Sequence, residues 1–207
     1  MNETGSKNKD TLEFSPEIET HPWEPFAPHN AKILIMGTFP PQPKRWSMDF
    51  YYPNRTNDFW YMMGLIFFND KYALYIENEK RFDLEKIKSL LNEKGIALHD
   101  TCRQIRRLKG NASDKFLEVV KPVPLYQLLA SMPECHTVAT TGEKAASIIA
   151  EITSTPLPKM GEHVVSDDKL DIWRMPSTSR AYPMKLEKKA DYYRTMFEAA
   201  GIMSIEK

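Results

Sequence analysis

The stretch Lys32-Ile-Leu-Ile-Met-Gly-Thr-Phe-Pro-Pro41 decides the fold. Its residues 33–36 form a continuous apolar run, which is typical of a strand that is buried on both faces of a parallel sheet. Gly37 ends the run, and a stiff loop with two prolines follows. The segment Tyr51-Tyr-Pro-Asn-Arg-Thr-Asn-Asp-Phe-Trp60 then crowds aromatic rings, amides and a cation into ten residues. Such a mixture after a buried strand indicates a pocket for a flat, polar heterocycle.

Three further short apolar segments predict strands at 96–98, 137–139 and 170–175. Helical patterns fill the gaps between them. The clearest helix follows Asp83, which is a good N-cap, and ends at Gly95. Other helices are expected at 59–66, 125–132, 143–152 and 186–200. Because strands alternate with helices, the sequence predicts an α/β fold, a three-layer sandwich with a central four-stranded, mainly parallel sheet flanked by helices.

The length of 207 residues favours a single domain, expected at 26–207 after a polar N-terminal arm at 1–25. The net charge is zero, with 28 basic and 28 acidic residues. The first thirty residues hold six of the acidic and two of the basic ones, so the remainder carries 26 basic and 22 acidic residues. That mild excess does not by itself demand a nucleic-acid partner.

The sequence also bears on the cellular compartment in which the protein is expected. No apolar run approaches the ~18 residues of a membrane span, and the polar N-terminal segment resembles neither a signal nor a transit peptide. The two cysteines, Cys102 and Cys135, lie far apart and form neither a disulfide framework nor a zinc motif. We therefore expect a cytoplasmic monomer with reduced thiols and no membrane contact.

Ligands of an open parallel sheet bind outside the carboxyl ends of its strands. The predicted strands end in short segments that are rich in hydroxyl groups, glycine or proline. If these ends meet, one crevice collects the following polar side chains: Thr38, Asp100, Thr141, Ser177, Thr178 and Ser179. The chain has no G-x-G-x-x-G fingerprint, no phosphate-binding loop, no G-x-S-x-G elbow and no metal cluster. We expect a polar pocket with an aromatic wall and with neither a cofactor nor a metal.

Two motifs resemble those of the uracil-DNA glycosylase superfamily, nearest to its mismatch-specific and hypoxanthine-type branches. The first is Gly37-Thr-Phe-Pro-Pro41 with Tyr51-Tyr52 and Asn57-Asp-Phe-Trp60. It is similar to the family's Gly-x-x-Pro loop and its Tyr-Tyr and Asn-x-Phe-Trp elements. The second is Met175-Pro-Ser-Thr-Ser179, which is similar to the family's Pro-Ser loop. The resemblance spans roughly residues 30–200 and implies the family's fold and activity.

One position departs from the family pattern. The family's uracil enzymes carry a water-activating Asp at the third place of the first motif, the mismatch-specific branch carries an Asn, and this chain has Phe39. The hypoxanthine-type branch also lacks a polar residue there and places an Asn before x-Phe-Trp, which matches Asn57. The resemblance therefore assigns water positioning to Asn57, which could instead cap the following helix. Asp100 is a candidate second polar catalyst, which could likewise be a cap.

The resemblance also implies residues that bind the base and the DNA. A glycosylase must flip its target base out of the stack. Phe59 matches the family's stacking residue, and base stacking is worth ~1–3 kcal/mol, although Phe59 could simply be a core residue. The remaining base-binding candidates are Gly37, Thr38, Phe39, Pro40 and Thr141. The DNA-binding candidates are Ser177, Thr178, Ser179, Arg180 and Lys185, with Arg180 at the place of the family's wedge, although this segment could be only a capped loop.

The sequence thus predicts a monofunctional DNA glycosylase that excises a deaminated or mismatched base, such as uracil or hypoxanthine, during base excision repair. Its expected partner is DNA with such a base, and the sequence leaves the base and the strandedness open. A catalytically silent nucleic-acid-binding protein of the same fold is the alternative, which Phe39 and the zero net charge favour. An enzyme acting on free nucleosides is disfavoured, because such a substrate needs no wedge loop.

Overall fold

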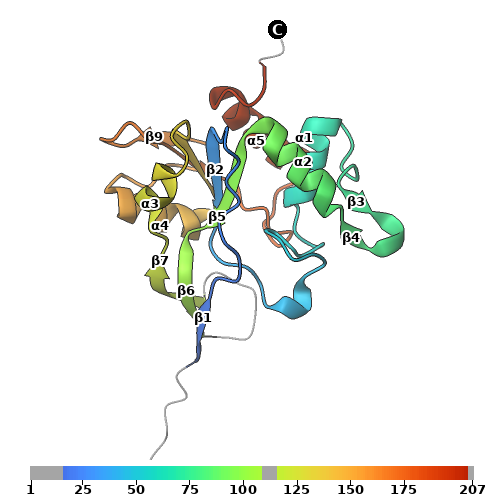
Figure 1. Ribbon diagram of the computed structural model, residues 1–207, viewed down its shortest axis with the longest axis horizontal. Coiled ribbons are helices and arrows are strands. Elements are labelled where there is room, and N and C mark those ends of the chain that lie inside the picture. The colour runs from blue at the N-terminus through green and yellow to red at the C-terminus, as the bar shows by residue number, and fades with distance from the viewer. Residues whose placement is uncertain (1–15, 109–115, 205–207) are drawn as a thin grey trace, which may run out of the picture.

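The computed structural model describes residues 16–108 and 116–204 (Figure 1). At its centre lies a five-stranded sheet with the order β5-β2-β8-β10-β9. The strands are β2 (Ile33–Gly37), β5 (Ile96–Asp100), β8 (Thr137–Thr141), β9 (His163–Val165) and β10 (Asp171–Met175). The first four strands of that order run parallel, and β9 pairs with β10 in the antiparallel sense. The molecule is therefore an α/β protein built on a mixed sheet.

The expectation of a four-stranded sheet is wrong by one strand. The four predicted strands are present, and β9 extends the sheet at its edge beside β10. This strand has only three residues, of which the two outer ones are exposed. A short edge strand needs no apolar run because solvent reaches it, so hydrophobic patterning gave no signal for it.

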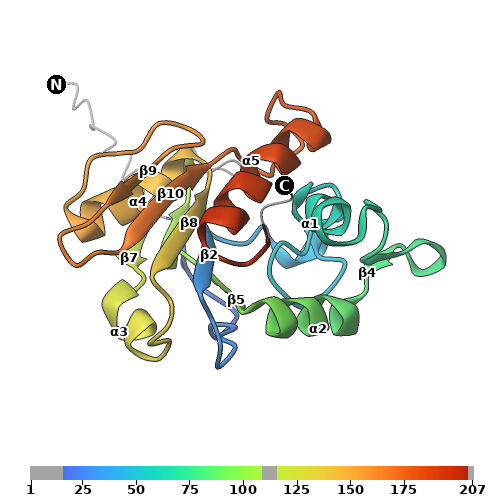
Figure 2. The same ribbon diagram turned by 90° about the horizontal axis from the view of Figure 1, so that it is seen from above.

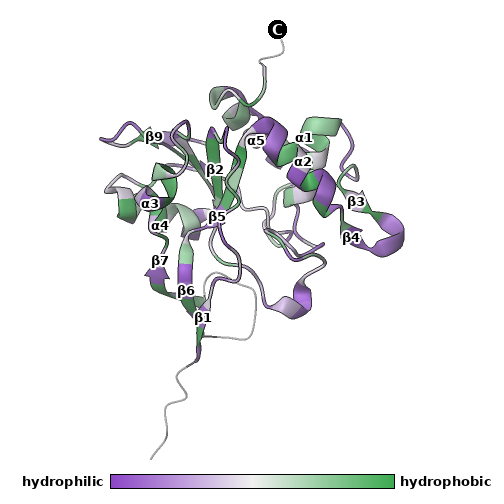
Figure 3. Ribbon diagram, viewed as in Figure 1, coloured by the Kyte–Doolittle hydropathy of each residue, from purple (hydrophilic) through white to green (hydrophobic). Residues whose placement is uncertain are grey.

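Both faces of the sheet are covered by helices, as the apolar run in β2 predicts. Ile33 and Ile35 pack in one core cluster with α1 (Phe59–Phe68), α2 (Leu84–Lys94) and α5 (Leu186–Ala199). Leu34 and Met36 point to the other face, where α3 (Leu125–Ala130) and α4 (Glu143–Thr153) supply a second cluster. Figure 2 shows these two groups of helices on opposite sides of the strands, and Figure 3 colours β2 as strongly hydrophobic.

The capping residues predicted for α2 are confirmed, whereas α1 is capped by a different residue from the one that its sequence suggests. The Asp83 side chain accepts the Lys86 backbone N–H at 3.1 Å, and Gly95 ends α2 with a φ of 66°. Asp58 precedes α1 but its carboxylate caps nothing there. Instead, the side-chain oxygen of Asn57 accepts the Phe59 backbone N–H at 2.9 Å. The carboxylate of Asp58 is thereby left for another role.

Smaller elements frame the carboxyl-terminal edge of the sheet. An antiparallel sheet joins β1 (Ile18–Thr20), β6 (Cys102–Arg107) and β7 (Leu117–Pro122). A hairpin of β3 (Tyr75–Ile76) and β4 (Arg81–Phe82) encloses the 3-10 turn η2 (Glu77–Glu79), and a second such turn, η1 (Pro43–Arg45), follows β2. Strand β1 belongs to the segment expected as an arm, of which residues 1–15 lie outside the described residues. The division into an arm and a domain at 26–207 stays a prediction.

Within residues 16–108 and 116–204, no helix is both long enough and apolar enough to cross a membrane.

Candidate active site

A pocket of about 290 Å³, called the site pocket here, opens at the carboxyl ends of the parallel strands. Strand β2 lies between β5 and β8 in the sheet. The chain passes from β2 to β5 through α1 and α2 on one face, and from β5 to β8 through α3 on the other. The pocket thus lies at the point where the strand order reverses, which is where α/β sheets bind ligands.

Most of the predicted site residues line this pocket. They are Gly37, Thr38, Phe39, Pro40, Asn57, Asp100, Thr141, Ser177, Thr178, Ser179 and Arg180. Two predicted residues do not line it: Phe59 is fully buried behind the pocket wall, and Lys185 is exposed at the start of α5. The structure therefore brings the two sequence motifs together around one cavity. Tyr52, Asn54 and Arg45 also line it.

Among the described residues that line the pocket, Asp100 alone carries a carboxylate, and it is 6% exposed. It lies so close to Gly37 that a Cβ at position 37 would meet its Oδ1 at 2.6 Å. Glycine at this position therefore admits the carboxylate to the end of β2. The other oxygen, Oδ2, lies 3.0 Å from His21 Nε2. Because an ionised carboxylate can only accept hydrogen bonds, the imidazole is the donor.

His21 is a site residue that the sequence analysis missed. It follows β1 in sequence, its side chain is fully buried, and its Nδ1 lies 2.9 Å from the Trp23 carbonyl oxygen. The His21 backbone N–H donates to the Arg103 carbonyl at 2.9 Å, which fixes the segment beside β6. A lone histidine in a polar segment carries no spacing signal, so only the pairing of β1 with β6 reveals its place.

A second histidine lies behind the first. His99 Nδ1 is 2.8 Å from the Tyr51 hydroxyl, and its ring centroid is 4.9 Å from that of His21. Burial, with the His21 imidazole adding to it, lowers the pKa of His99 from 6.5 to about 4. His99 is consequently neutral at physiological pH. It supports the floor of the pocket but does not line it.

Tyr52 presents the aromatic wall that the sequence assigned to Phe59. Its ring stacks on that of Phe59 with centroids 3.8 Å apart, and its hydroxyl lies 3.3 Å from Thr141 Oγ1. Burial, with the Asp100 carboxylate adding to it, raises the pKa of the Tyr52 hydroxyl well above its usual value, so the phenol stays neutral. Its φ of 51° lies in the left-handed region, where bulky residues are strained and cluster at functional sites.

Asn57 lies in the pocket wall with its oxygen occupied. The side-chain Oδ1 caps α1 at Phe59, as described above, and the backbone of Asn57 bridges to Ser179. The amide NH2 of the side chain makes no hydrogen bond to a described residue and can donate to a ligand, while the oxygen is already tied to the helix start. This geometry suits orientation of a polar group more than acceptance of a proton from water.

A buried ion pair holds the two motifs together. Lys189 of α5 is fully buried, and its Nζ donates to Asp58 Oδ2 and to the Ser179 carbonyl, each at 2.9 Å. Arg180 Nε reaches Asp58 Oδ1 at 3.3 Å, and the Asp58 backbone N–H donates to the Thr178 carbonyl at 2.8 Å. Asp58 and Lys189 thus fix loop 176–180 against the start of α1.

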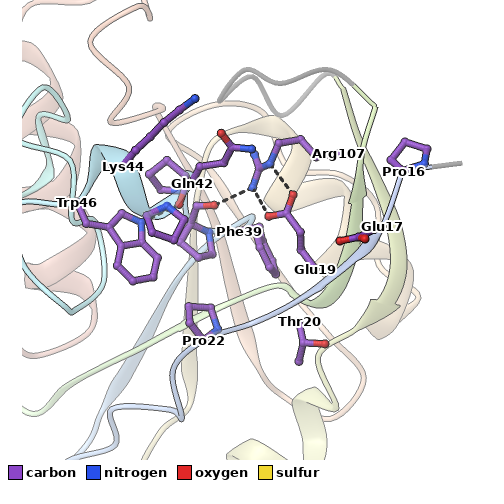
Figure 4. A pocket seen from close by; sticks show the side chains of 13 residues that line it. Pro16, Glu17, Glu19, Thr20, Pro22, Phe39, Gln42, Lys44, Trp46 and Arg107 are labelled. Carbon is purple, nitrogen blue, oxygen red and sulfur yellow. Dashed lines mark hydrogen bonds and ion pairs between the residues drawn. The ribbon is translucent and has the colours of Figure 1, made fainter. Parts of the chain in front are cut away.

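A larger hollow of about 750 Å³ lies on the other side of the loop that carries Phe39 (Figure 4). There the guanidinium of Arg107 pairs with both carboxylate oxygens of Glu19, at 2.9 and 3.0 Å, and donates to the Pro40 carbonyl at 3.1 Å. Figure 4 shows this guanidinium between β1 and the loop. The pair fixes the loop whose residues Phe39 and Pro40 also line the site pocket.

Among the described residues, no group of three or more His, Cys, Asp or Glu side chains could hold a metal ion.

Solved structures share the fold of this chain. No family model and no curated protein matches the sequence. The fold is similar to a structure from Methanosarcina acetivorans described as the "Solution NMR Structure of a putative Uracil DNA glycosylase", with a TM-score of 0.60 and 18% identity. The match covers 89% of this chain and 99% of the other. At this identity the likeness establishes a shared fold, which agrees with the fold that the two motifs imply.

Proposed function

We propose that the chain is a monofunctional DNA glycosylase of the uracil-DNA glycosylase superfamily, acting as a cytoplasmic monomer in base excision repair. Its substrate is a deaminated or mismatched base that is flipped into the site pocket and released by hydrolysis of the N-glycosidic bond. The observation that carries this proposal is the Asp100 carboxylate in the pocket lining, held by Gly37 and His21 at the ends of two parallel strands.

Asp100 takes the role for which Phe39 is unsuited. Its Oδ1 accepts no hydrogen bond from any described residue, while Oδ2 is held by His21. The free oxygen can accept a hydrogen bond from a water molecule and orient it toward the anomeric carbon. In the reaction the bond from sugar to base breaks and the base leaves with the electron pair. Water then adds to the oxocarbenium-like sugar and passes its proton to Asp100.

His21 sustains this chemistry without touching the substrate. Its Nε2–H holds the second carboxylate oxygen of Asp100 and so fixes the orientation of the carboxylate. A carboxylate next to the sugar also stabilises the positive charge that develops there. His21 is therefore a positioning residue in this proposal.

The walls suit a flat base. The ring of Tyr52, supported by Phe59, offers a stacking face, and the hydroxyl groups of Tyr52 and Thr141 offer polar contacts to a base edge. The amide group of Asn57 can orient a base carbonyl or the attacking water. The backbone N–H of Phe39 donates to no described residue and is available to a base oxygen, as in an oxyanion hole.

The loop 176–180 is the proposed contact to the DNA backbone. Ser177 and Ser179 carry hydroxyl groups at the mouth of the pocket, and such groups suit phosphate contacts. Arg180 is exposed on one side while its Nε is tied to Asp58, so its planar head is held at the entrance. A guanidinium in that place can fill the gap that the flipped base leaves in the stack.

The test is strand cleavage with alkali after incubation with oligonucleotides carrying uracil, hypoxanthine, xanthine or a thymine mismatch. The unmodified protein is expected to excise at least one of these bases. Asp100→Asn is expected to slow excision by about 10²–10⁴-fold, the range for a lost general base. Asn57→Ala should slow it less, because a neutral amide can orient water but is too weak a base to take its proton, and its oxygen is already held by the Phe59 N–H. Absence of cleavage on every substrate would refute the enzyme proposal.

The alternative function is a catalytically silent nucleic-acid-binding protein of the same fold. Phe39, in the place of the family's acid, is the observation that favours it. Salt-sensitive DNA binding without excision of any base would support this alternative. An excision rate that depends on Asp100 would exclude it.

A further inference from the structure

A third hollow, called the basic hollow here, adjoins the site pocket and has a volume of about 560 Å³. Its charged lining residues are Lys44, Arg45, Arg55, Glu79, Lys80 and Arg81. Five of these six side chains are cations, in a protein whose overall net charge is zero. The concentration of one sign of charge is therefore local.

Three separate segments bring these cations together. Lys44 and Arg45 belong to η1, Arg55 lies in the loop before α1, and Lys80 and Arg81 come from the β3–β4 hairpin. Figure 3 colours the tip of that hairpin as hydrophilic. The three segments are not contiguous in the sequence, so no continuous basic run predicts the cluster. Their convergence is a property of the fold.

Most of this positive charge has no partner within the protein. Glu79 Oε2 pairs with Arg81 Nε at 2.6 Å, which neutralises one cation. Across residues 16–108 and 116–204, no ion pair is made by Lys44, Arg45, Arg55 or Lys80, and all four are exposed. Side chains of like charge that line one hollow repel each other, and an anion in the hollow relieves that repulsion.

The basic hollow is continuous with the site pocket. Arg45, Asn54 and Thr56 line both. The side-chain oxygen of Asn54 accepts hydrogen bonds from the Thr56 N–H and hydroxyl, both at 2.9 Å, so the shared rim is an ordered turn. A polymer with one unit in the site pocket would therefore place the neighbouring units over the basic hollow.

An aromatic ring lies in the wall of the basic hollow. The Trp46 indole is fixed by its Nε1–H, which donates to the Pro41 carbonyl at 2.7 Å, and by contact with the Trp23 ring at 4.7 Å between centroids. Unpaired point charges suit phosphates, and a fixed aromatic ring suits a stacked base. The acidic side chains of a peptide would use the charges but carry no ring to stack on the indole, whereas every nucleotide carries both a phosphate and a base.

We infer that the basic hollow binds the phosphate backbone of the DNA strand whose base enters the site pocket, next to the flipped nucleotide. The identity of the polymer rests on the proposed function. None of the five cations except Arg45 lines the site pocket, so the surface can be altered without changing the residues that surround the base.

The test is the salt dependence of binding to undamaged oligonucleotides, single-stranded and duplex, measured by fluorescence anisotropy. The variant is Arg55→Gln with Lys80→Gln. The matched control is Lys121→Gln with Lys159→Gln, which removes two exposed cations outside the three hollows described. Each phosphate contact contributes a slope of about −0.9 in log K against log salt on duplex DNA. The variant is expected to lose two such contacts. A fourfold rise in salt concentration should therefore lower the DNA-binding constant of the unmodified protein by about 12-fold more than that of the variant.

The control is expected to keep the full slope. Equal slopes for the variant and the unmodified protein would overturn the inference, and so would absence of binding by the unmodified protein at low salt. If the double variant has a lowered melting temperature, the two single variants are measured instead. Each is then expected to show about half of the change in the salt slope. Because undamaged DNA is used, the result does not depend on excision. A protein that binds through this surface but releases no base would refute the proposed function alone.

Discussion

Substitution of Gly37 by alanine tests the arrangement of the pocket floor. The added Cβ would lie 2.6 Å from Asp100 Oδ1 and 3.5 Å from the Tyr52 hydroxyl. An ordinary contact begins near 3.4 Å, so the carboxylate must retreat by about 0.8 Å. If this movement is directed away from His21, the 3.0 Å hydrogen bond lengthens beyond the 3.5 Å limit of such bonds. Alanine at this position therefore dislodges the group on which the proposed chemistry depends.

The expected magnitudes follow from that displacement. Overpacking of a well-filled site costs about 1–3 kcal/mol, and we expect the lower end because the displaced atom ends a side chain. A misplacement of about 1 Å at a reacting group slows a reaction by roughly 100-fold. Urea denaturation measures the first effect, and single-turnover excision on the best substrate measures the second.

A double-mutant cycle isolates the cause. In the Asp100→Ala background the obstructing oxygen is absent, so Gly37→Ala should then cost little stability. The interaction free energy between the two substitutions is expected to lie within about 0.5–3 kcal/mol. Gly64→Ala is the control, because its Cβ would also meet an oxygen at 2.6 Å, the Asp70 backbone carbonyl, outside the site pocket. It should destabilise the fold and leave the excision rate unchanged. The same stability loss from Gly37→Ala in both backgrounds would show that the carboxylate does not press on Gly37.

Three further outcomes are expected. Because burial lowers the pKa of His99 to about 4, the unfolded chain binds the extra proton between about pH 4 and 6.5. The free energy of unfolding should therefore rise with pH across that window, by on the order of 3 kcal/mol, and His99→Gln should flatten the rise in urea titrations; an unchanged slope in the variant would contradict this. Lys189→Met leaves the buried Asp58 carboxylate with Arg180 as its remaining cationic partner and should cost about 3 kcal/mol, the lower end for a broken buried pair, with part of the loss recovered when Asp58→Asn is added; no recovery would argue against the pair. Asp83→Ala removes the N-cap of α2 and should cost about 1 kcal/mol in thermal unfolding with no change in excision, whereas a slower excision would connect α2 to the site.

The elements that could be predicted from the sequence are those whose pattern is local. The run 33–36 gave β2 because a doubly buried strand needs apolar residues on both faces, and Asp83 with Gly95 bounded α2 because caps act within one turn. Strand β9 and the sheet of β1, β6 and β7 were not predicted from the sequence. Their residues are partly exposed, and their pairing depends on segments that are distant in sequence.

The same distinction separates the site residues. Asp100 was predicted because it ends a strand, and strand ends of a parallel sheet converge by geometry alone. His21 and Lys189 were not, because each acts through a partner 79 or 131 positions away. Phe59 and Tyr52 are adjacent in the fold, and only the packing decides which ring reaches the cavity.

The buried pair of Lys189 and Asp58 has a consequence for biosynthesis. Lys189 lies in α5, the last helix of the described chain, and it holds the loop that completes the pocket wall. The ribosome delivers this helix after every strand of the central sheet. A chain that is cut short before α5 therefore contains the strand residues and Asp100 but lacks both the helix that covers one face of the sheet and the lysine that holds the loop. The order of synthesis thus makes translation of α5 a precondition for a finished site.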